Sequence, residues 1–348
     1  MRIVIATVQV PFVRGGAEVL AEGLRDAIVA AGHAAEIVAI PFKWYPPERI
    51  LDHMLACRLL DLTESMGTPV DRVIGLKFPA YLITHPNKVL WLVHQHRQAY
   101  ERWNHPHGDL MHAPAGMQVR DAVRAADREH IRQAKAVFAI SAHVGARLSR
   151  FCGIDATPLY HPPAHAELFY SREAEDYLFF PSRLGADKRQ QLVLEALAQT
   201  RSPVRVRFAG RADHPAHAGE LAALAQRFGV EPRVQWLGSI SEEDKRREYA
   251  QALGAVFPTE DEDYGYVALE AMLAAKPLIV CADSGGPLEF VRHGETGLVA
   301  EPSPAALAAA MDALWNDRRQ ARAWGDAGRR HYAGMDITWA AVVERLLA

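Results

Sequence analysis

The stretch EDEDYGYVALEAM, residues 260–272, contains two glutamates whose positions need a chemical explanation. From Gly265 onward, apolar residues cover nearly every side of a helical turn, which predicts a buried helix that contains Glu270. A buried carboxylate without a partner costs several kcal/mol, on the order of the net stability of a domain. We therefore expect Glu270 to have a partner, and two vicinal hydroxyls of a bound polyol would provide one.

Glu262 stands at the mouth of the same helix, and seven residues separate it from Glu270. Its carboxylate can accept hydroxyls from a second polyol in the same way. Between the two glutamates, the helix N-terminus would direct backbone N–H groups at a phosphate. These amides belong to Tyr264, Gly265, Tyr266 and Val267. A polyol, a phosphate and a second polyol in that order make a sugar nucleotide, which is the ligand that this stretch predicts.

Arg183 and Lys188 lie in the segment PSRLGADKRQQ, after a predicted strand at 177–181 and before a predicted helix at 191–199. Two cations in such a loop can converge on a diphosphate, because arginine offers a planar fork and lysine a point charge. Taken alone, the pair is more typical of solvated loop charges. The pair indicates a diphosphate site only in combination with Glu262 and Glu270.

Gly15 and Gly16 lie between the first predicted strand and the first predicted helix, in the segment QVPFVRGGAE. Glycines at a helix N-terminus let the backbone approach an anion. A tight turn is the alternative interpretation. The segment is not a GxGxxG motif, so neither a nicotinamide nor a flavin cofactor is indicated.

The composition excludes several classes of protein. A net charge of −3 over 348 residues gives no strong attraction to nucleic acid. The 3 cysteines are widely spaced and include no CxxC, so neither a disulfide framework nor a structural zinc site is expected. We see no signal peptide and no apolar run near the roughly 18 residues of a spanning helix, which predicts a cytoplasmic protein.

Strands alternate with helices in two series, which predicts an α/β protein with two doubly wound parallel sheets. The proline-rich segment PLYHPPAH, residues 158–165, separates the series as a linker. We expect a first domain at 1–165 together with a C-terminal helix at about 333–348, and a second domain at 166–332. Doubly wound sheets bind ligands at the carboxyl ends of their strands, so a cleft between the domains is the expected site.

Four patterns together resemble the retaining glycosyltransferases of family 4, which have the GT-B fold of two Rossmann-like doubly wound domains facing a central cleft. They are Gly-Gly-x-Glu after the first strand, Arg-x4-Lys in the second half, the run from Pro258 to Met272, and DSGGPLEFVRHGETGLV at 283–299. The resemblance covers almost all of the second half and the first half in outline. The patterns are specific in combination and weak singly.

The resemblance implies a role for each matching residue around the donor. Glu262 would hold hydroxyls of the donor sugar, and Glu270 would hold the ribose. Arg183 and Lys188 would bind the diphosphate, with backbone amides added by the Gly15–Gly16 pair and by residues 264–267. The base would lie near Arg211, Trp236 and Leu237.

His94 matches the first-half histidine that lies near the donor sugar in this family. The residues expected to be catalytic are Glu262, Arg183, Lys188 and His94. The residues that follow His94 are expected to contact the acceptor, namely His96, Arg97 and Tyr100. The sequence departs from the family pattern at Arg189, where a glycine is common, and after Glu262, where Asp-Tyr replaces the more usual Pro-Phe.

Three other patterns have competing interpretations. Residues 261–263 form a DxD, which binds a divalent metal in other glycosyltransferases, but the Arg183–Lys188 pair already neutralises a diphosphate, so we expect no metal and no cofactor.

The spacings of the histidines fit no common ligand rule, which favours surface or acceptor-site positions for His94, His96, His105, His107 and His112. The third pattern is an arginine ridge that marks either a solvated helix face or an anionic partner such as a lipid surface, and it comprises Arg120, Arg124, Arg128 and Arg132.

These observations predict a retaining transferase that moves a hexose from a nucleotide diphosphate sugar to an acceptor hydroxyl. The acceptor would be a sugar, a lipid-linked sugar or a small molecule in surface polysaccharide, glycolipid or glycoside biosynthesis. No residue is an evident nucleophile, so a front-face substitution is the expected mechanism. A sugar-nucleotide epimerase and a non-catalytic nucleotide-sugar-binding subunit stay open as alternatives. Contact with the inner face of a membrane through the first domain also stays open.

Overall fold

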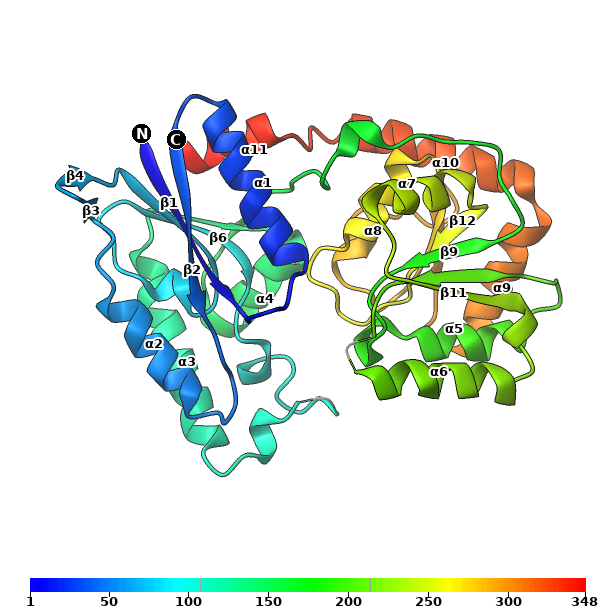
Figure 1. Cartoon of the computed structure of the whole chain (residues 1–348), viewed down its shortest axis with the longest axis horizontal. Coiled ribbons are helices and arrows are strands. Elements are labelled where there is room, and N and C mark those ends of the chain that lie inside the picture. The colour runs from blue at the N-terminus through cyan, green and yellow to red at the C-terminus, as the bar shows by residue number, and fades with distance from the viewer. Residues whose placement is uncertain (107, 213) are drawn as a thin grey trace. The chain divides into compact units, whose positions relative to one another are not determined.

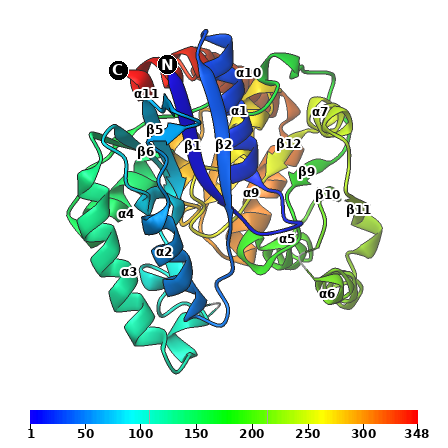
Figure 2. The same cartoon turned by 60° about the vertical axis from the view of Figure 1, so that its left-hand side comes forward.

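A computed structural model describes residues 1–106, 108–212 and 214–348 of the chain. The chain forms two compact units, each with its own sheet and core. Unit 1 contains Met1–Ala164 and Thr338–Ala348, and unit 2 contains His165–Ile337. In both units a parallel sheet is covered by helices, as Figures 1 and 2 show from two sides.

Unit 1 is built on a six-stranded parallel sheet in the order β2-β1-β5-β6-β7-β8. Its strands are β1 (Arg2–Gln9), β2 (Ala34–Pro41), β5 (Arg72–Lys77), β6 (Lys88–His94), β7 (Ala136–Ala139) and β8 (Thr157–Pro158), with a small hairpin of β3 (Glu64–Ser65) and β4 (Thr68–Pro69). Its α-helices are α1 (Gly16–Ala30), α2 (Arg49–Leu59), α3 (Gly116–His130), α4 (Ala142–Cys152) and α11 (Trp339–Leu347). Short 3-10 helices are η1 (Ala80–Leu82), η2 (Arg97–Ala99), η3 (Leu110–His112) and η4 (Ile131–Gln133).

Unit 2 repeats this architecture with the strand order β11-β10-β9-β12-β13-β14. Its strands are β9 (Leu178–Pro181), β10 (Val206–Ala209), β11 (Val234–Gly238), β12 (Gly254–Val256), β13 (Leu278–Cys281) and β14 (Gly297–Ala300). Its α-helices are α5 (Gln190–Leu197), α6 (Pro215–Arg227), α7 (Glu242–Gln251), α8 (Tyr266–Leu273), α9 (Pro304–Asn316) and α10 (Arg318–Ala333). Short 3-10 helices are η5 (Ala166–Leu168), η6 (Ala186–Lys188), η7 (Glu231–Arg233) and η8 (Gly286–Glu289).

The central strands of unit 2 are apolar on both faces because helices cover both sides of the sheet (Figure 1). All four residues of β9 are buried, and β9 pairs in parallel with both β10 and β12. The strand order reverses between β9 and β12, since the chain continues outward from β9 to β11 and then returns to the other side of β9. Doubly wound sheets bind their ligands at such a switch point, beyond the carboxyl ends of the strands.

The observed elements confirm the predicted α/β architecture and add several that the sequence analysis did not find. The sequence predicts a strand at 35–40 and the next strand at 89–93, with no element between them, and both β5 and α2 lie in that interval. The C-terminal helix, predicted to begin at about 333, instead begins at Trp339, because α10 continues to Ala333 and Thr338 caps the new helix. In the part of the chain that is described, no helix combines the length and the apolar character that a membrane crossing demands.

Candidate functional site

Three loops meet at the carboxyl edge of the unit 2 sheet, around the switch point between β9 and β12. The loop after β12 is fixed by backbone hydrogen bonds to the other two loops. The amide of Glu260 donates to the carbonyl of Asp187 at 3.0 Å, and the amide of Glu262 donates to the carbonyl of Ser284 at 2.9 Å. These backbone hydrogen bonds therefore fix the position of Glu262 next to the loop that follows β9.

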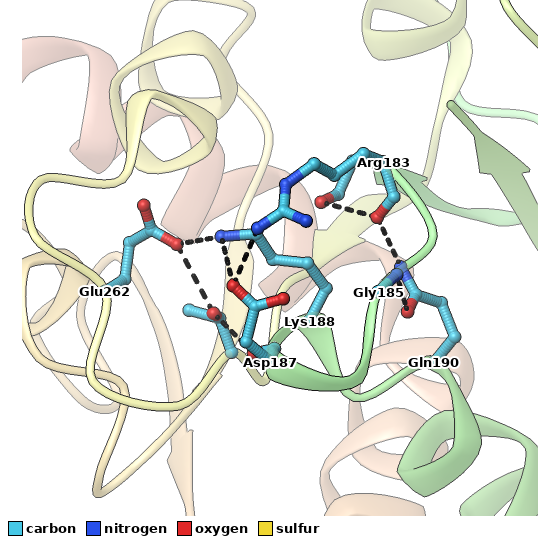
Figure 3. A network of polar contacts seen from close by, with 8 residues as sticks. Arg183, Gly185, Asp187, Lys188, Gln190 and Glu262 are labelled. Carbon is cyan, nitrogen blue, oxygen red and sulfur yellow. Dashed lines mark hydrogen bonds and ion pairs between the residues drawn. The ribbon is translucent and has the colours of Figure 1, made fainter. Parts of the chain in front are cut away.

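Arg183, Lys188 and Glu262 come together in this loop cluster, as the sequence predicted (Figure 3). The Lys188 ammonium contacts the Glu262 carboxylate, and its Nζ lies 3.6 Å from Oδ2 of Asp187. The Arg183 guanidinium pairs with the same Asp187 oxygen at 2.9 Å. Asp187 thus holds both cations of the predicted diphosphate site, and an anionic ligand would have to compete with it.

Gln190 fixes the loop that carries these cations (Figure 3). Its side chain is buried, and its amide donates to the carbonyl of Arg183 at 2.9 Å while its oxygen accepts from the amide of Gly185 at 3.3 Å. Both ends of the turn between Arg183 and Gly185 are therefore tied to the first residue of α5. A buried side chain with both groups satisfied gives a rigid anchor.

Arg189, where the family commonly has a glycine, adopts a left-handed conformation with φ of 58°. Glycine takes such a conformation at little cost, whereas another residue needs compensating interactions. The Arg189 guanidinium supplies them by making two hydrogen bonds of 2.8 Å to the Asp283 carboxylate, and it lies 3.4 Å from Glu260. This departure from the family pattern therefore adds a charged connection between the loops after β9 and β13.

Glu270 is buried on α8, and the protein itself provides its partners. Lys245 of α7 donates to one carboxylate oxygen at 2.8 Å, and the Tyr249 hydroxyl donates to the other at 2.8 Å. Burial of Lys245 opposes its charge, but the carboxylates of Glu270 and Glu242 outweigh this effect and raise the Lys245 pKa. The partner expected for the buried Glu270 is therefore present, but it consists of a protein ammonium and a protein hydroxyl, so burial alone does not indicate a bound polyol.

The carboxylate of Glu270 nevertheless keeps the capacity to bind a ligand. Each of its oxygens accepts one bond from the protein, and a carboxylate oxygen can accept two. Lys245 and Tyr249 also hold the carboxylate in one orientation. The ribose contact implied by the family resemblance stays a prediction that this geometry permits.

The N-terminus of α8 depends on a close approach between Gly265 and Pro287. Gly265 is the N-cap residue with φ of 86°, and a Cβ there would lie 2.5 Å from Cγ of Pro287. Only glycine fits this position. Tyr264 is buried against Tyr266, with ring centroids 5.3 Å apart. The amides of residues 264–267 are thus positioned by packing at the same edge of the sheet as Arg183 and Lys188.

The residues predicted to lie near the base follow β10 or belong to β11. Trp236 on β11 is half-buried and stacks on Phe208, with ring centroids 4.6 Å apart. Leu237 follows it, and Arg211 is exposed after β10. The carbonyl of Arg211 accepts a 2.8 Å bond from the amide of Leu184. These residues therefore share the carboxyl edge of the sheet with the cation loop.

The predicted glycines and His94 belong to unit 1. Gly15 caps α1, and its amide donates to Glu18 at 2.7 Å; Gly16 is the first residue of the helix. His94 ends β6 and lies half-buried, with Nδ1 2.6 Å from the carbonyl oxygen of Gln95. The glycine pair follows β1 and His94 ends β6, so both lie at the carboxyl edge of the unit 1 sheet, whose strand order reverses between β1 and β5.

The three predicted acceptor residues have different environments. His96 is half-buried, and burial lowers its pKa to about 4, so the ring is neutral at pH 7. Arg97 pairs with Glu101 at 2.6 Å. Tyr100 is buried, and its hydroxyl donates to Asp127 at 2.8 Å. The Tyr100 hydroxyl is thus already used inside unit 1, and the contact with the acceptor predicted for this residue stays a prediction.

The described histidines do not gather into a metal site. Among the described residues, no group of three or more His, Cys, Asp or Glu side chains is arranged to hold a metal ion. His107, one of the five histidines considered from the sequence, lies outside the described residues. The expectation that no metal is required stays a prediction.

The arginine ridge lies on α3 and the following η4, and part of it packs within unit 1. The Arg120 guanidinium lies 4.3 Å above the Trp103 ring, and Arg132 donates to the carbonyl of Gly153 at 2.9 Å. Arg124 lies 5.3 Å from the centre of the Tyr100 ring. Arg128 and Arg132 are exposed, so both interpretations of the ridge stay open.

Sequence analysis missed several residues that shape the site. Asp187 lies four residues after Arg183, a spacing at which opposite charges can pair, and this signal would have found it. Lys245 and Tyr249 are also four residues apart, so they share one face of α7. Nothing local indicates that this face meets Glu270, because the contact depends on how α7 packs against α8.

Residues 169–331 match the family model described as glycosyl transferases group 1. The D-rhamnosyltransferase WbpZ of Pseudomonas aeruginosa is 34% identical over 50% of this chain and 45% of that protein. The O-antigen chain mannosyltransferase C of Escherichia coli is 26% identical over 53% of this chain and 48% of that protein. The chain thus matches less than half the length of these curated relatives.

Solved structures resemble the chain over nearly its full length. Sucrose-phosphate synthase of Thermosynechococcus elongatus has a TM-score of 0.79 and 19% identity, and the similarity covers 99% of this chain and 97% of the other. HepE of Anabaena, solved in complex with UDP-glucose, has a TM-score of 0.74 and 16% identity, with 100% and 98% covered. At such identities the likeness concerns the fold, and it confirms the predicted GT-B fold.

Proposed function

We propose that this chain, whose residues 169–331 match the family model of glycosyl transferases group 1, is a retaining glycosyltransferase. It moves a hexosyl group from a nucleotide diphosphate sugar to an acceptor hydroxyl in polysaccharide, glycolipid or glycoside biosynthesis. Two observations on relatives support this proposal. WbpZ is named a rhamnosyltransferase, and the structure of HepE contains UDP-glucose.

The observation that carries the proposal is the meeting of Arg183, Lys188 and Glu262 at the switch point of the unit 2 sheet. Two cations and a carboxylate at one point suit a ligand that has both a diphosphate and hydroxyl groups. Glu270 lies on the helix that follows, with a fixed orientation and spare acceptor capacity. Unit 2 is accordingly proposed to bind the donor.

The proposed reaction is a front-face substitution at the anomeric carbon. The bond from this carbon to the phosphate oxygen breaks, and the acceptor oxygen bonds on the same face. The acceptor proton passes to the departing phosphate oxygen, so protons and charge balance without a protein nucleophile. Arg183 and Lys188 would stabilise the negative charge that develops on the diphosphate, an electrostatic contribution that is large where water is excluded.

Unit 1 is proposed to bind the acceptor, with His94, His96 and Arg97 as the residues to examine first. His94 is the last residue of β6, at the carboxyl edge of the unit 1 sheet, which is the expected side for a ligand. Its ring or its backbone carbonyl would lie near the anomeric carbon. A cytoplasmic location, with or without contact to the inner face of a membrane, is part of the same proposal.

The proposal is tested by incubating the full chain with a panel of nucleotide sugars and measuring slow release of nucleoside diphosphate. We expect hydrolysis of one donor, and Arg183→Ala or Lys188→Ala should lower turnover about a hundredfold or more, on the order of 3 kcal/mol. Arg227→Ala, on the exposed end of α6, is the matched control and should behave as the wild type.

Each rival function gives a different product pattern in this experiment. An epimerase would convert the nucleotide sugar into its epimer, and the variants would slow that conversion. A non-catalytic binding subunit would bind a nucleotide sugar and leave it unchanged. Near-normal turnover in both cation variants would show that the diphosphate is bound elsewhere.

A further inference from the structure

Unit 2 contains a second cationic region at the edge of its sheet that is opposite to the candidate donor site. It is a cavity of about 760 Å³. Leu253 and Lys276 line it just before β12 and β13 begin, so the cavity lies at the amino ends of these strands. The donor-site loops follow the carboxyl ends of the same sheet. The two regions are therefore separate.

Cations predominate among the residues that line this cavity. The positive side chains are Arg172, Lys276, Arg318, Arg319 and Arg322. The negative side chains that line it are Glu173 and Asp326. Arg318 is neutralised by Asp176 at 2.7 Å, and Asp176 lies outside the cavity lining. The cavity lining therefore keeps an excess of positive charge even when the Arg318–Asp176 ion pair is counted as neutral.

Lys276 distinguishes this cavity from an ordinary solvated helix face. Its side chain is only 5% exposed, and its ammonium donates to the backbone carbonyl of Arg172 at 3.0 Å. Among the described residues, no carboxylate forms an ion pair with it. Burial, assisted by the nearby Arg322 and opposed by Asp326, lowers its pKa to about 8. A buried ammonium is normally paired with an anion, and among the described residues no carboxylate lies close enough to pair with Lys276.

The cavity wall is built by close packing of α10 on the turn that carries Lys276. Gly325 of α10 approaches the carbonyl of Ala275 so closely that a Cβ would lie 2.1 Å from the carbonyl oxygen. Arg322 lies one helical turn before this contact and is therefore held beside Lys276. Among the described residues, neither Arg319 nor Arg322 takes part in an ion pair or a hydrogen bond through its guanidinium.

We propose that this cavity binds a phosphate monoester. Arg319 and Arg322 can each offer a planar fork to the phosphate oxygens, and Lys276 gains the counter-ion that it lacks. The lining also includes Leu253, Pro277 and Ala321, which suit the less polar part of an esterified ligand. The same chemistry occurs in a sugar phosphate and in the headgroup of an acidic phospholipid. The site is independent of the proposed glycosyltransferase activity.

Calorimetric titration of the full chain with glucose 6-phosphate tests the proposal. The titration is done with saturating nucleoside diphosphate, so that the anion site at Arg183 and Lys188 is already filled. We expect the wild type to bind, and the double variant Arg319→Ala/Arg322→Ala to lose roughly tenfold or more in affinity. Lys276→Met, which keeps the aliphatic chain, should also weaken binding. Arg329→Ala/Arg330→Ala on the same helix is the matched control.

A second arm identifies the source of the phosphate. Vesicles of phosphatidic acid in phosphatidylcholine are compared with vesicles of phosphatidylcholine alone, by co-sedimentation with the same variants. Binding of the acidic vesicles that is lost in the Arg319→Ala/Arg322→Ala variant would assign a lipid headgroup, whereas binding of glucose 6-phosphate alone would assign a soluble ligand. Absence of both kinds of binding in the wild type, or equal binding by this variant, would overturn the proposal.

Discussion

Glu270 and Glu262 have different partners in the protein, and this difference predicts different roles. Glu270 is oriented by Lys245 and Tyr249 deep in unit 2, whereas Glu262 faces the Lys188 ammonium in the cation loop. A ligand that spans both would meet Glu270 with one end and Glu262 with the other. The resemblance to family 4 places the ribose at the first and the sugar at the second.

Substitution of each glutamate by glutamine should separate these roles. Glu270→Gln replaces one acceptor by a donor, so binding of the nucleoside diphosphate product should weaken by roughly 1 to 3 kcal/mol. Glu262→Gln should bind this product almost as the wild type does while transfer falls steeply, because its partner is proposed to be the sugar. Calorimetric titration with nucleoside diphosphate measures the contrast.

Glu243→Gln, on the exposed face of α7, serves as the control for a lost negative charge. An equal loss of product affinity in the Glu262 and Glu270 variants would contradict the idea that they bind opposite ends of the donor. It would leave both residues with a general electrostatic role.

The cation loop could be predicted from sequence because its residues are close along the chain and follow one strand. Arg183 and Lys188 flank a single turn, and Glu262 follows a neighbouring strand at the same edge. The partners of Glu270 could not be predicted, since Lys245 lies 25 residues away on another helix. Burial alone required a partner for Glu270 but could not distinguish a protein side chain from a ligand.

At the level of elements, apolar runs and helical periodicity were sufficient for most of the two sheets. Strand β5 was missed, although its residues are mostly buried. It contains Gly75, and a Cβ at this position would lie 2.9 Å from Cα of Tyr81. The absence of a side chain at Gly75 therefore lets η1 pack closely against the strand. A glycine inside a short apolar run weakens the strand signal in a sequence, although tertiary packing requires it here.

Gly210 makes a similar close approach between the loops after β9 and β10. A Cβ at this position would lie 2.1 Å from the carbonyl oxygen of Ser182, next to Arg183. We expect Gly210→Ala to cost roughly 1 to 3 kcal/mol of stability and to displace the cation loop. Transfer by the folded variant should therefore fall. Chemical denaturation and steady-state kinetics measure the two effects.

Gly229→Ala provides the comparison, because Gly229 has φ of 67° and a Cβ at this position would meet no atom within 4 Å. Backbone strain there should cost roughly 1 to 2 kcal/mol without any effect on transfer. If both variants lost activity equally at temperatures where they stay folded, Gly210 would not position the cation loop.

For the whole molecule, each unit has its own sheet and core, and both cationic side chains that are predicted to bind the diphosphate lie in unit 2. Binding of nucleoside diphosphate should therefore slow amide hydrogen exchange mainly in two segments of unit 2, 182–189 and 259–270. Helix α6 should be unaffected and serves as the internal reference.

The same exchange experiment, repeated in excess chelator, tests whether a metal is needed. We expect unchanged protection, because Arg183 and Lys188 supply positive charge to the diphosphate without a divalent ion. Asp187 and Glu262 form ion pairs with these cations, and a bound diphosphate would have to displace the two carboxylates. If this free-energy cost were too large, a divalent metal would be needed to supply further positive charge. Protection that disappears with chelator and returns with manganese would therefore restore the metal hypothesis for residues 261–263. Protection confined to unit 1 would reverse the proposed roles of the two units.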